Sequence, residues 1–221
     1  MNQLSGNTPM PTAPENAYSG FVATRIASLP CDIVILPADD LAHKAISLSE
    51  QLAQHGTLFT LKDGARYPHA SLYMTQLKVA DLEKVKALLA AIAASTPQLD
   101  ITATRYDQAE GYIDVEYART EALAHLQMTV VEAINPIRDG MYAATGKARE
   151  SLEKYGYRGV GELFRPHLTL TRFVGGRSID ANTLPEPNEF SGRFVRLGLF
   201  EMGDNGTCVR KIAEFELEGG G

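Results

Sequence analysis

The sequence predicts an α+β domain built around antiparallel sheets, and three observations support this fold class. Segments with the period of amphipathic helices alternate with strand-like segments through the first half of the chain. Two strand-like segments close the chain at 191–202 and 207–218, and the Asn-Gly step between them supplies the positive φ angles of a tight hairpin turn. No linker-like composition interrupts residues 30–217, so a single domain is expected.

The domain is expected to cover residues 21–218. Residues 1–20 are rich in Pro, Asn, Ser and Thr and are expected to form a flexible arm, and residues 219–221 form a Gly tail. With 221 residues, the chain is long enough to bury a sizeable core.

The predicted helices share an apolar stripe at helical spacing, with a polar capping residue before the first turn or a Gly or Pro after the last. They are expected between Asp39 and Gly56, from Asp81 to Ser95, and between Thr120 and Pro136.

The predicted strands are short and are either alternating or continuously apolar. They are expected at residues 31–37, 69–77, 99–106, 111–118, 167–173, 191–202 and 207–218. Residues 107–111 are expected to form a hairpin turn, residues 139–165 a mixture of helix and loop, and residues 177–190 a loop.

The composition excludes several classes of protein. The formal net charge is −6 and the sequence pI is about 5.4, so nonspecific binding to DNA or RNA, which depends on many Lys and Arg, is not expected. Cys31 and Cys208 have no metal-ligand spacing, so neither a metal nor another cofactor is expected. The apolar run at 87–94 is too short to cross a membrane, and the first residues do not resemble a signal peptide. A reducing cytoplasm is the expected location.

One polar pair stands out at the start of the strand at 69–77. In "RYPHASL" (66–72), strand alternation places the His69 imidazole and the Ser71 hydroxyl on one face. Taken alone, this pair favours a strand with a solvated outer face, because such pairs are common.

A second copy of the pattern changes that interpretation. "FRPHLTL" (164–170) repeats Pro-His-x-[Ser/Thr]-Leu and again begins a predicted strand, with His167 and Thr169 on one face. Composition alone does not account for two such histidines among five. The other three, His43, His55 and His125, lie on polar helix faces or in a last helical turn and are expected to be solvated.

Two strands of this kind, placed side by side, would carry out acid–base chemistry on a phosphate ester. The hydroxyls can hold a phosphoryl oxygen. A neutral imidazole can take a proton from the attacking group while a protonated one gives a proton to the leaving oxygen, since the pKa of His lies near neutrality. The residues alone leave open which histidine is the acid.

The paired motifs "HASL" (69–72) and "HLTLTR" (167–172) resemble those of the 2H phosphoesterase superfamily, in particular its 2′-5′ RNA ligase-like branch of RNA 2′,3′-cyclic phosphodiesterases. The order of elements over about 31–217 is also similar. The resemblance implies a bilobal fold, in which two antiparallel sheets with pseudo-two-fold symmetry are flanked by helices and enclose a cleft.

The same resemblance implies the roles of five residues. His69 and His167 would be the acid–base pair, Ser71 and Thr169 would bind phosphate, and Arg172 would assist at the anion site. Simple alternation places Arg172 on the face opposite His167, unless the strand bends or ends there.

The chain departs from the branch in the first motif. It has Ser71 where Thr is more usual, and Met74 occupies the position that matches Arg172 in the second motif, so the two halves are not equivalent.

Aromatic residues near the motifs have two interpretations. Tyr73 and Phe173 follow the motifs on the faces of their histidines and would either stack on a base or pack in the core. Tyr155, Tyr157 and Arg158 precede the second motif and are candidates for a cleft wall.

Together these features predict a metal-independent cyclic phosphodiesterase that acts on a 2′,3′-cyclic phosphate of RNA or a nucleotide. Two alternatives remain: 2′-5′ RNA ligation by the reverse reaction, or a nucleotide- or RNA-end-binding module without turnover. No phosphate-cradling GxxxxGK[ST] motif occurs, so ATP is not implied. The expected partner is a small cyclic phosphodiester or an RNA terminus, and the chain is expected to be a monomer.

Overall fold

The computed structural model describes residues 28–141 and 148–218 of the chain. The arm expected at 1–20 and the Gly tail expected at 219–221 lie outside this range. Within it, no helix has both the length and the apolar character needed to cross a membrane.

The strands form one antiparallel sheet in the order β3-β7-β1-β2-β6-β5-β4, with β8 also paired to β7. Their bounds are β1 Ser28–Pro37, β2 Ala70–Lys78, β3 Leu99–Ile101, β4 Ala103–Ala109, β5 Tyr112–Tyr117, β6 His167–Arg172, β7 Gly192–Met202 and β8 Cys208–Glu216. The α+β class expected from the sequence is confirmed.

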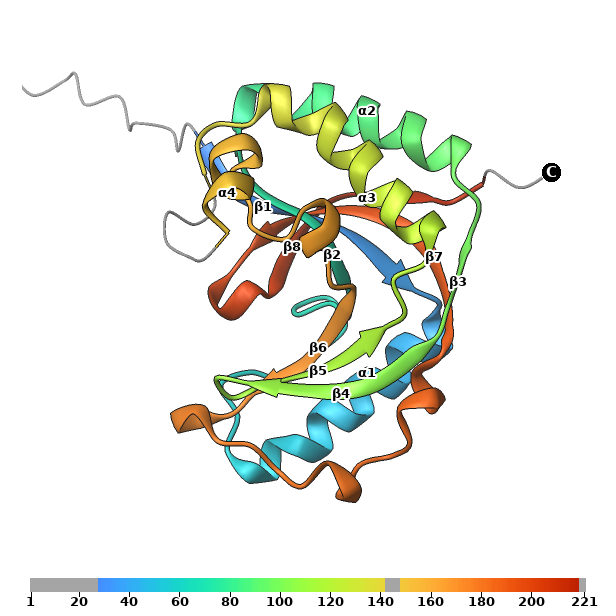
Figure 1. Ribbon diagram of the computed structural model, residues 1–221, viewed down its shortest axis with the longest axis vertical. Coiled ribbons are helices and arrows are strands. Elements are labelled where there is room, and N and C mark those ends of the chain that lie inside the picture. Colours follow the sequence, from blue (N-terminus) through green and yellow to red (C-terminus); the bar gives the residue numbers. More distant parts are fainter. Residues whose placement is uncertain (1–27, 142–147, 219–221) are drawn as a thin grey trace, which may run out of the picture.

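The sheet consists of two halves that meet at one point. One half contains β1, β2, β7 and β8, and the other contains β4, β5 and β6. A single residue pair, Ala70 with Leu168, joins β2 to β6 and makes the two expected sheets continuous. Figure 1 shows the two halves one above the other. Since Ala70 and Leu168 directly follow His69 and His167, the junction brings the two motifs together.

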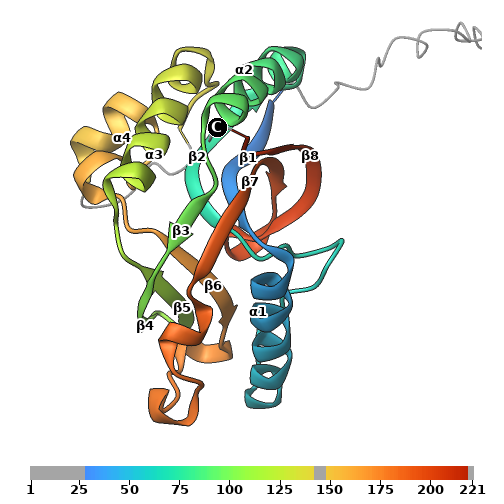
Figure 2. The same cartoon turned by 90° about the vertical axis from the view of Figure 1, so that its right-hand side faces the viewer.

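The helices are α1 Asp39–Leu52, α2 Leu82–Ser95, α3 Glu121–Ile134 and α4 Arg149–Tyr155. Helix α1 follows β1 in the chain but packs mainly against β6 of the other half. Helix α3 follows β5 and packs against β2 and α2. Figure 2 shows α1 at one end of the molecule and α2 and α3 at the other. This exchange of helices ties the two halves together.

Helix α1 shows how the sequence directs this packing. The apolar stripe of α1 consists of Leu41, Ala45, Leu48 and Leu52; these side chains are buried and join one core that is continuous across both halves. Ser49 on the same side is also buried, and its hydroxyl donates to the carbonyl of Leu170 at 2.7 Å. The polar contact fixes α1 against β6.

One expected strand is divided. Residues 99–106 form β3 and β4, which separate at Thr102. The reason is a change of partner, because Ile101 pairs with β7 whereas Ala103 pairs with β5. The closing hairpin is confirmed, and its Asn205 and Gly206 have the positive φ angles (61° and 72°) that the Asn-Gly step predicted.

Candidate active site

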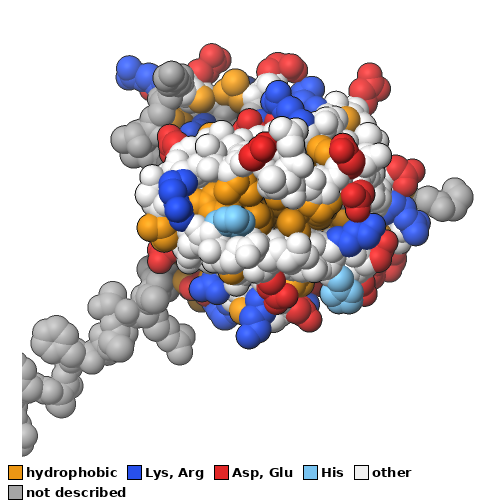
Figure 3. Space-filling view, turned by 90° about the horizontal axis from the view of Figure 1, so that it is seen from below, with side chains coloured by type: hydrophobic (Ala, Val, Ile, Leu, Met, Phe, Trp, Pro, Cys, Tyr) orange, Lys and Arg blue, Asp and Glu red, His pale blue; other side chains and the backbone are white. Residues whose placement is uncertain are grey.

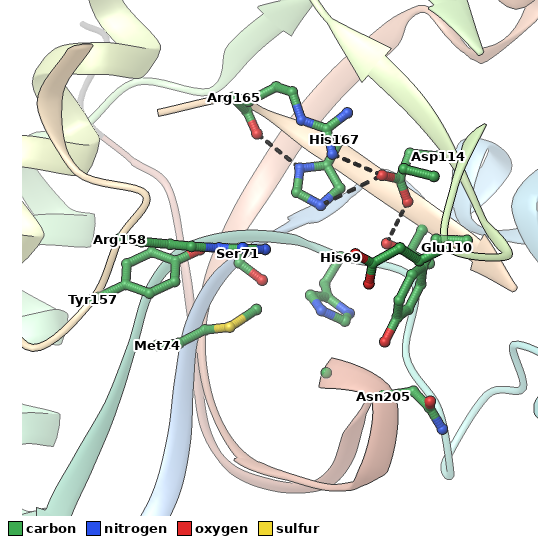
Figure 4. A pocket seen from close by; sticks show the side chains of 14 residues that line it. His69, Ser71, Met74, Glu110, Asp114, Tyr157, Arg158, Arg165, His167 and Asn205 are labelled. Carbon is green, nitrogen blue, oxygen red and sulfur yellow. Dashed lines mark hydrogen bonds and ion pairs between the residues drawn. The ribbon is translucent and has the colours of Figure 1, made fainter. Parts of the chain in front are cut away.

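Both motifs line one cavity of about 560 Å³ between the halves of the sheet. His69 and Ser71 contribute from the start of β2, and His167 and Thr169 from the start of β6. Figure 4 shows both imidazoles facing this space. The other three histidines, His43, His55 and His125, are exposed on α1, after it, and on α3. The structure therefore brings together the two histidines that share the sequence pattern.

A β-bulge in each motif strand determines which side chains reach the cavity. Leu72 is an extra residue in β2 relative to β1, and Leu170 is an extra residue in β6 relative to β5. A bulge shifts the alternation of faces. After it, Met74 and Arg172, each five residues beyond its histidine, lie on the partly exposed side of the strand. The bend that would place Arg172 on the same side as His167 is thus present.

Of the two interpretations of Tyr73 and Phe173, the bulges favour packing in the core over contact with the substrate. Both side chains are turned into the core, with 0% and 1% exposure, and neither lines the cavity. The Tyr73 hydroxyl donates to the main-chain carbonyl of Tyr155, and Tyr155 does not line the cavity either. Tyr157 and Arg158 do line it, as expected for a cleft wall.

The main chain orients both imidazoles in the same way. Nδ1 of His69 lies 2.7 Å from the carbonyl oxygen of Tyr67, and Nδ1 of His167 lies 2.7 Å from that of Arg165. A carbonyl oxygen only accepts hydrogen bonds, so Nδ1 carries the proton in both rings. In the neutral form, Nε2 of each ring therefore has a free lone pair for proton transfer.

Two aspartates missed by the sequence analysis complete the motifs. The Ser71 hydroxyl donates to Asp32 Oδ2 at 2.6 Å, and the Thr169 hydroxyl donates to Asp114 Oδ1 at 2.7 Å. Asp114 lies directly opposite Thr169 in the β5–β6 pair, whereas Asp32 lies opposite Met74 and reaches Ser71 diagonally. Each motif hydroxyl thus bonds to an aspartate of the neighbouring strand, although the two aspartates occupy different positions relative to their hydroxyls.

The two aspartates differ in their charge environments. Asp114 Oδ2 accepts a 2.9 Å ion-paired hydrogen bond from Arg165, whose guanidinium also pairs with Asp107. Asp32 is fully buried, and its Oδ1 has no hydrogen-bond partner among the described residues. Burial raises the pKa of Asp32 to about 7, against the lowering effect of the Ser71 hydrogen bond.

His69 is also in an environment that disfavours charge. Burial and, to a smaller extent, the neighbouring His167 lower its pKa to about 4, against the raising effect of hydrogen bonds to the backbone of Tyr67 and Gly206. Its Nε2 lies 3.6 Å from Asp32 Oδ2. Burial favours the neutral form of both groups. At a pH between the two pKa values, the contact therefore joins two neutral groups and is not an ion pair.

Arg172 lies at the rim and is engaged with protein groups. Its guanidinium donates to the carbonyl of Glu110 and, at 2.9 Å, to Asn205 Oδ1. It also lies 4.6 Å from the centroid of the Tyr112 ring. Arg172 therefore connects the β4–β5 turn to the β7–β8 turn, while Arg165 and Arg158 are the arginines that line the cavity.

Donor atoms that could hold a metal ion occur beside His69. Among residues 28–141 and 148–218, one group contains Asp32, His69 and Cys208, whose ligand atoms lie within 4.8 Å of one another. No sequence pattern predicted this group, because its members come from three separate strand regions.

The surface charges agree with the acidic composition. Figure 3 shows Lys and Arg side chains interspersed with Asp and Glu around an apolar strip on the face seen from below. On this face the basic side chains do not form the continuous field that nonspecific nucleic-acid binding requires.

No protein-family model matches the sequence, and no curated protein matches it significantly. Solved structures do match over most of the chain. E. coli LigT in complex with NADP+ is 14% identical, with a TM-score of 0.54 over 86% of this chain and 99% of LigT. LigT has also been solved with phosphate, with 3′-AMP and with ATP.

Two further structures give similar values. A phosphoesterase is 12% identical, with a TM-score of 0.56 over 86% of this chain and 98% of its own. A protein from Thermus thermophilus is 12% identical, with a TM-score of 0.56 over 87% of this chain and 100% of its own. At these identities the likeness concerns the fold. The 2H phosphoesterase-like fold expected from the paired motifs is confirmed, and the chain has the fold of LigT and of the solved phosphoesterase.

Proposed function

We propose that the protein is a metal-independent cyclic phosphodiesterase that hydrolyses a 2′,3′-cyclic phosphate of RNA or of a nucleotide. The observation that carries this proposal is the matched orientation of two imidazoles in one cavity. Each ring has Nδ1 bonded to a main-chain carbonyl and leaves Nε2 for proton transfer. Two such groups supply both proton transfers of phosphodiester hydrolysis.

His69 is proposed as the general base. Its side chain is only 10% exposed, and burial favours the neutral ring, whose Nε2 lone pair can accept a proton from water. His167 is proposed as the general acid. Its side chain is 26% exposed, more than that of His69, and its Nε2 lies 3.9 Å from the Asp114 carboxylate.

In the proposed reaction, water attacks phosphorus and gives one proton to Nε2 of His69. The new P–O bond forms as one ester P–O bond of the ring breaks, and the leaving alcohol oxygen takes a proton from Nε2 of His167. Loss of the 3′ oxygen would leave a 2′-phosphomonoester. Exchange with solvent then returns His69 to the neutral form and His167 to the protonated form.

The phosphoryl oxygens are proposed to bind between Ser71, Thr169 and Arg165. Ser71 can donate to phosphate when Asp32 is a neutral carboxylic acid, because the Asp32 proton then satisfies the Ser71 oxygen. The Thr169 hydroxyl donates to Asp114, which Arg165 neutralises, and it would turn from Asp114 to a phosphoryl oxygen when the substrate binds. Arg165 also places a guanidinium at the cavity wall for the phosphate charge. Arg172 is proposed to assist from the rim.

A nucleotide substrate fits the cavity lining. Tyr157 and Arg158 offer an aromatic face and a cation beside the histidines. LigT, which has the same fold, has been solved with 3′-AMP, ATP and NADP+, so a nucleotide-like ligand is proposed here as well.

The test is hydrolysis of a panel of cyclic phosphates, including 2′,3′-cyclic nucleotides and ADP-ribose cyclic phosphate, with the product regiochemistry read by phosphorus NMR. Hydrolysis is expected with EDTA present. His69→Ala and His167→Ala should each lower kcat by about 10²–10⁴, while the exposed His43→Ala and His125→Ala serve as matched controls. Loss of hydrolysis in EDTA, or full activity of either active-site variant, would contradict the proposal.

Ligation is the second candidate. A 5′-hydroxyl would take the place of water: it attacks phosphorus and gives its proton to Nε2 of His69, while the ring bond to the 3′ oxygen breaks and that oxygen takes a proton from Nε2 of His167. The product would be a 2′-5′ linkage. Incubation with two RNA ends separates the candidates, because ligation gives a longer RNA whereas hydrolysis gives a phosphomonoester. Tight binding of nucleotides without either product would instead indicate a binding module.

A further inference from the structure

A thiol, an imidazole and a carboxylate converge beside the proposed base. Their donor atoms, from Cys208, His69 and Asp32, lie within 4.8 Å of one another. Cys208 begins β8, Asp32 lies in β1, and His69 directly precedes β2. Cys208 and Asp32 are fully buried, whereas the His69 ring reaches the cavity. The group therefore lies behind the His69 ring, which borders the cavity.

The group has unused bonding capacity. Asp32 Oδ1 is buried without a hydrogen-bond partner among the described residues, and Cys208 is a free thiol. Nδ1 of His69 is bonded to the carbonyl oxygen of Tyr67, so Nε2 is the ring nitrogen that faces Asp32. Histidines that bind metals typically donate their other ring N–H to a carbonyl or carboxylate, as His69 does here.

The three donor atoms match the preference of one class of metal ion. Thiolate sulfur, imidazole nitrogen and carboxylate oxygen are the usual ligands of Zn²⁺, and in a tetrahedral zinc site neighbouring nitrogen and oxygen donors lie about 3.4 Å apart. The Asp32 Oδ2 to His69 Nε2 distance is 3.6 Å. A thiolate and a carboxylate together balance the two positive charges of the ion. A neutral complex of this kind can be buried at less cost than separate charges.

We propose that Asp32, His69 and Cys208 form an inhibitory site for Zn²⁺ and for the similar thiophilic ion Cd²⁺. Binding would release the Cys208 thiol proton, and the carboxyl proton where Asp32 holds one, to solvent. The ion would occupy the Nε2 lone pair that the proposed hydrolysis uses. The inhibition rests on the proposed function, whereas metal binding by these residues does not.

The binding test uses the full chain, stripped of metal, and titrates it with Cd²⁺ or Zn²⁺ alone. One ion per chain is expected in equilibrium dialysis, with a thiolate-to-cadmium charge-transfer absorption in the ultraviolet. Cys208→Ser should abolish the absorption and weaken binding by more than about 100-fold, which exceeds the loss typical of outer-shell changes. Cys31→Ser is the matched control, because Cys31 is also a buried free thiol but lies outside the group.

The activity test compares each variant with its own metal-free rate. Zn²⁺ should inhibit hydrolysis by the wild type and by Cys31→Ser, EDTA should reverse the inhibition, and Cys208→Ser should resist it. Circular dichroism melting checks the fold, and Cys208→Ala replaces Cys208→Ser where serine unfolds the chain. Absence of the charge-transfer band in the wild type, or equal binding by both cysteine variants, would overturn the proposal. Failure of hydrolysis without metal would count against the proposed function alone.

Discussion

The Ser71 hydroxyl donates a 2.6 Å hydrogen bond to Asp32, a carboxyl group that is fully buried and has no Lys or Arg side chain paired with it among the described residues. Burial raises the pKa of Asp32 from 3.8 to about 7. The folded state therefore holds a proton that the unfolded state has lost between these pH values. The contribution of Asp32 to stability is greatest at low pH and declines as the pH rises to about 7.

Asp32→Asn should remove this decline. His69 contributes the opposite slope, because its pKa is lowered to about 4, so the difference between wild type and variant is the informative quantity. Urea unfolding at pH 5 and pH 8, in EDTA, should show the variant gaining stability relative to the wild type at the higher pH. Asp114→Asn is the control, since Asp114 is paired with Arg165. An equal difference at both pH values would contradict the prediction.

Arg165 is expected to matter for substrate affinity. Its guanidinium lines the cavity and bonds to Asp114 and Asp107 at 2.9 Å. Arg165→Met should raise the KM for a cyclic phosphate by about tenfold or more, as expected for loss of a charge-assisted hydrogen bond of about 1.5–3 kcal/mol. Arg105→Met is the matched control, because Arg105 also pairs with an acidic side chain of the sheet, Glu116, but does not line the cavity. Steady-state kinetics of both variants check this, and an unchanged KM for Arg165→Met would be the contrary result.

Arg172 is expected to act by holding two turns together rather than by touching phosphate. It donates to the Glu110 carbonyl and to Asn205 Oδ1, so the two turns meet through one guanidinium. Arg172→Met and Asn205→Ala should therefore raise KM by similar factors, and the double variant should be no worse than either single change. Such non-additivity is typical of residues that share one contact. Additive effects in the double-mutant cycle would indicate that Arg172 binds the substrate itself.

The sequence predicted helices α1, α2 and α3, the strands around the motifs and the two histidines, because periodicity and the repeated motif are local signals. It did not predict the bulges at Leu72 and Leu170. A bulge is decided by how a strand pairs with its neighbour, and an extra leucine in an apolar strand leaves no mark in the pattern. The stacking interpretation of Tyr73 and Phe173, which their burial does not support, follows from this one omission.

The aspartates escaped prediction for a related reason. Asp32 lies within the apolar run of β1, and Asp114 within an alternating strand, and neither is near a motif in the sequence. Their role depends on cross-strand register, which places Asp114 opposite Thr169 and lets Asp32 reach Ser71 diagonally. Register in turn depends on the whole sheet. Arg165 gave a weak signal, since it precedes the Pro-His step of the second motif.

The position of Tyr73 in the core leads to the last prediction. Its hydroxyl donates to the carbonyl of Tyr155 in α4, and its ring is fully buried. Tyr73→Phe leaves that carbonyl without its donor and should lower the free energy of unfolding by about 0.5–1.5 kcal/mol. KM and kcat for a cyclic phosphate should stay unchanged, because the ring does not line the cavity.

Tyr157→Ala is the matched comparison, because Tyr157 does line the cavity. It should raise the KM for a cyclic nucleotide. The expected loss of binding free energy is about 1–3 kcal/mol, which is the contribution of stacking one base on an aromatic ring. Urea unfolding and steady-state kinetics of both variants give the two readouts. A raised KM in Tyr73→Phe at unchanged stability would mean that the bulge at Leu72 does not hold Tyr73 in the core. In that case Tyr73 would lie on the substrate side of β2, where simple strand alternation placed it.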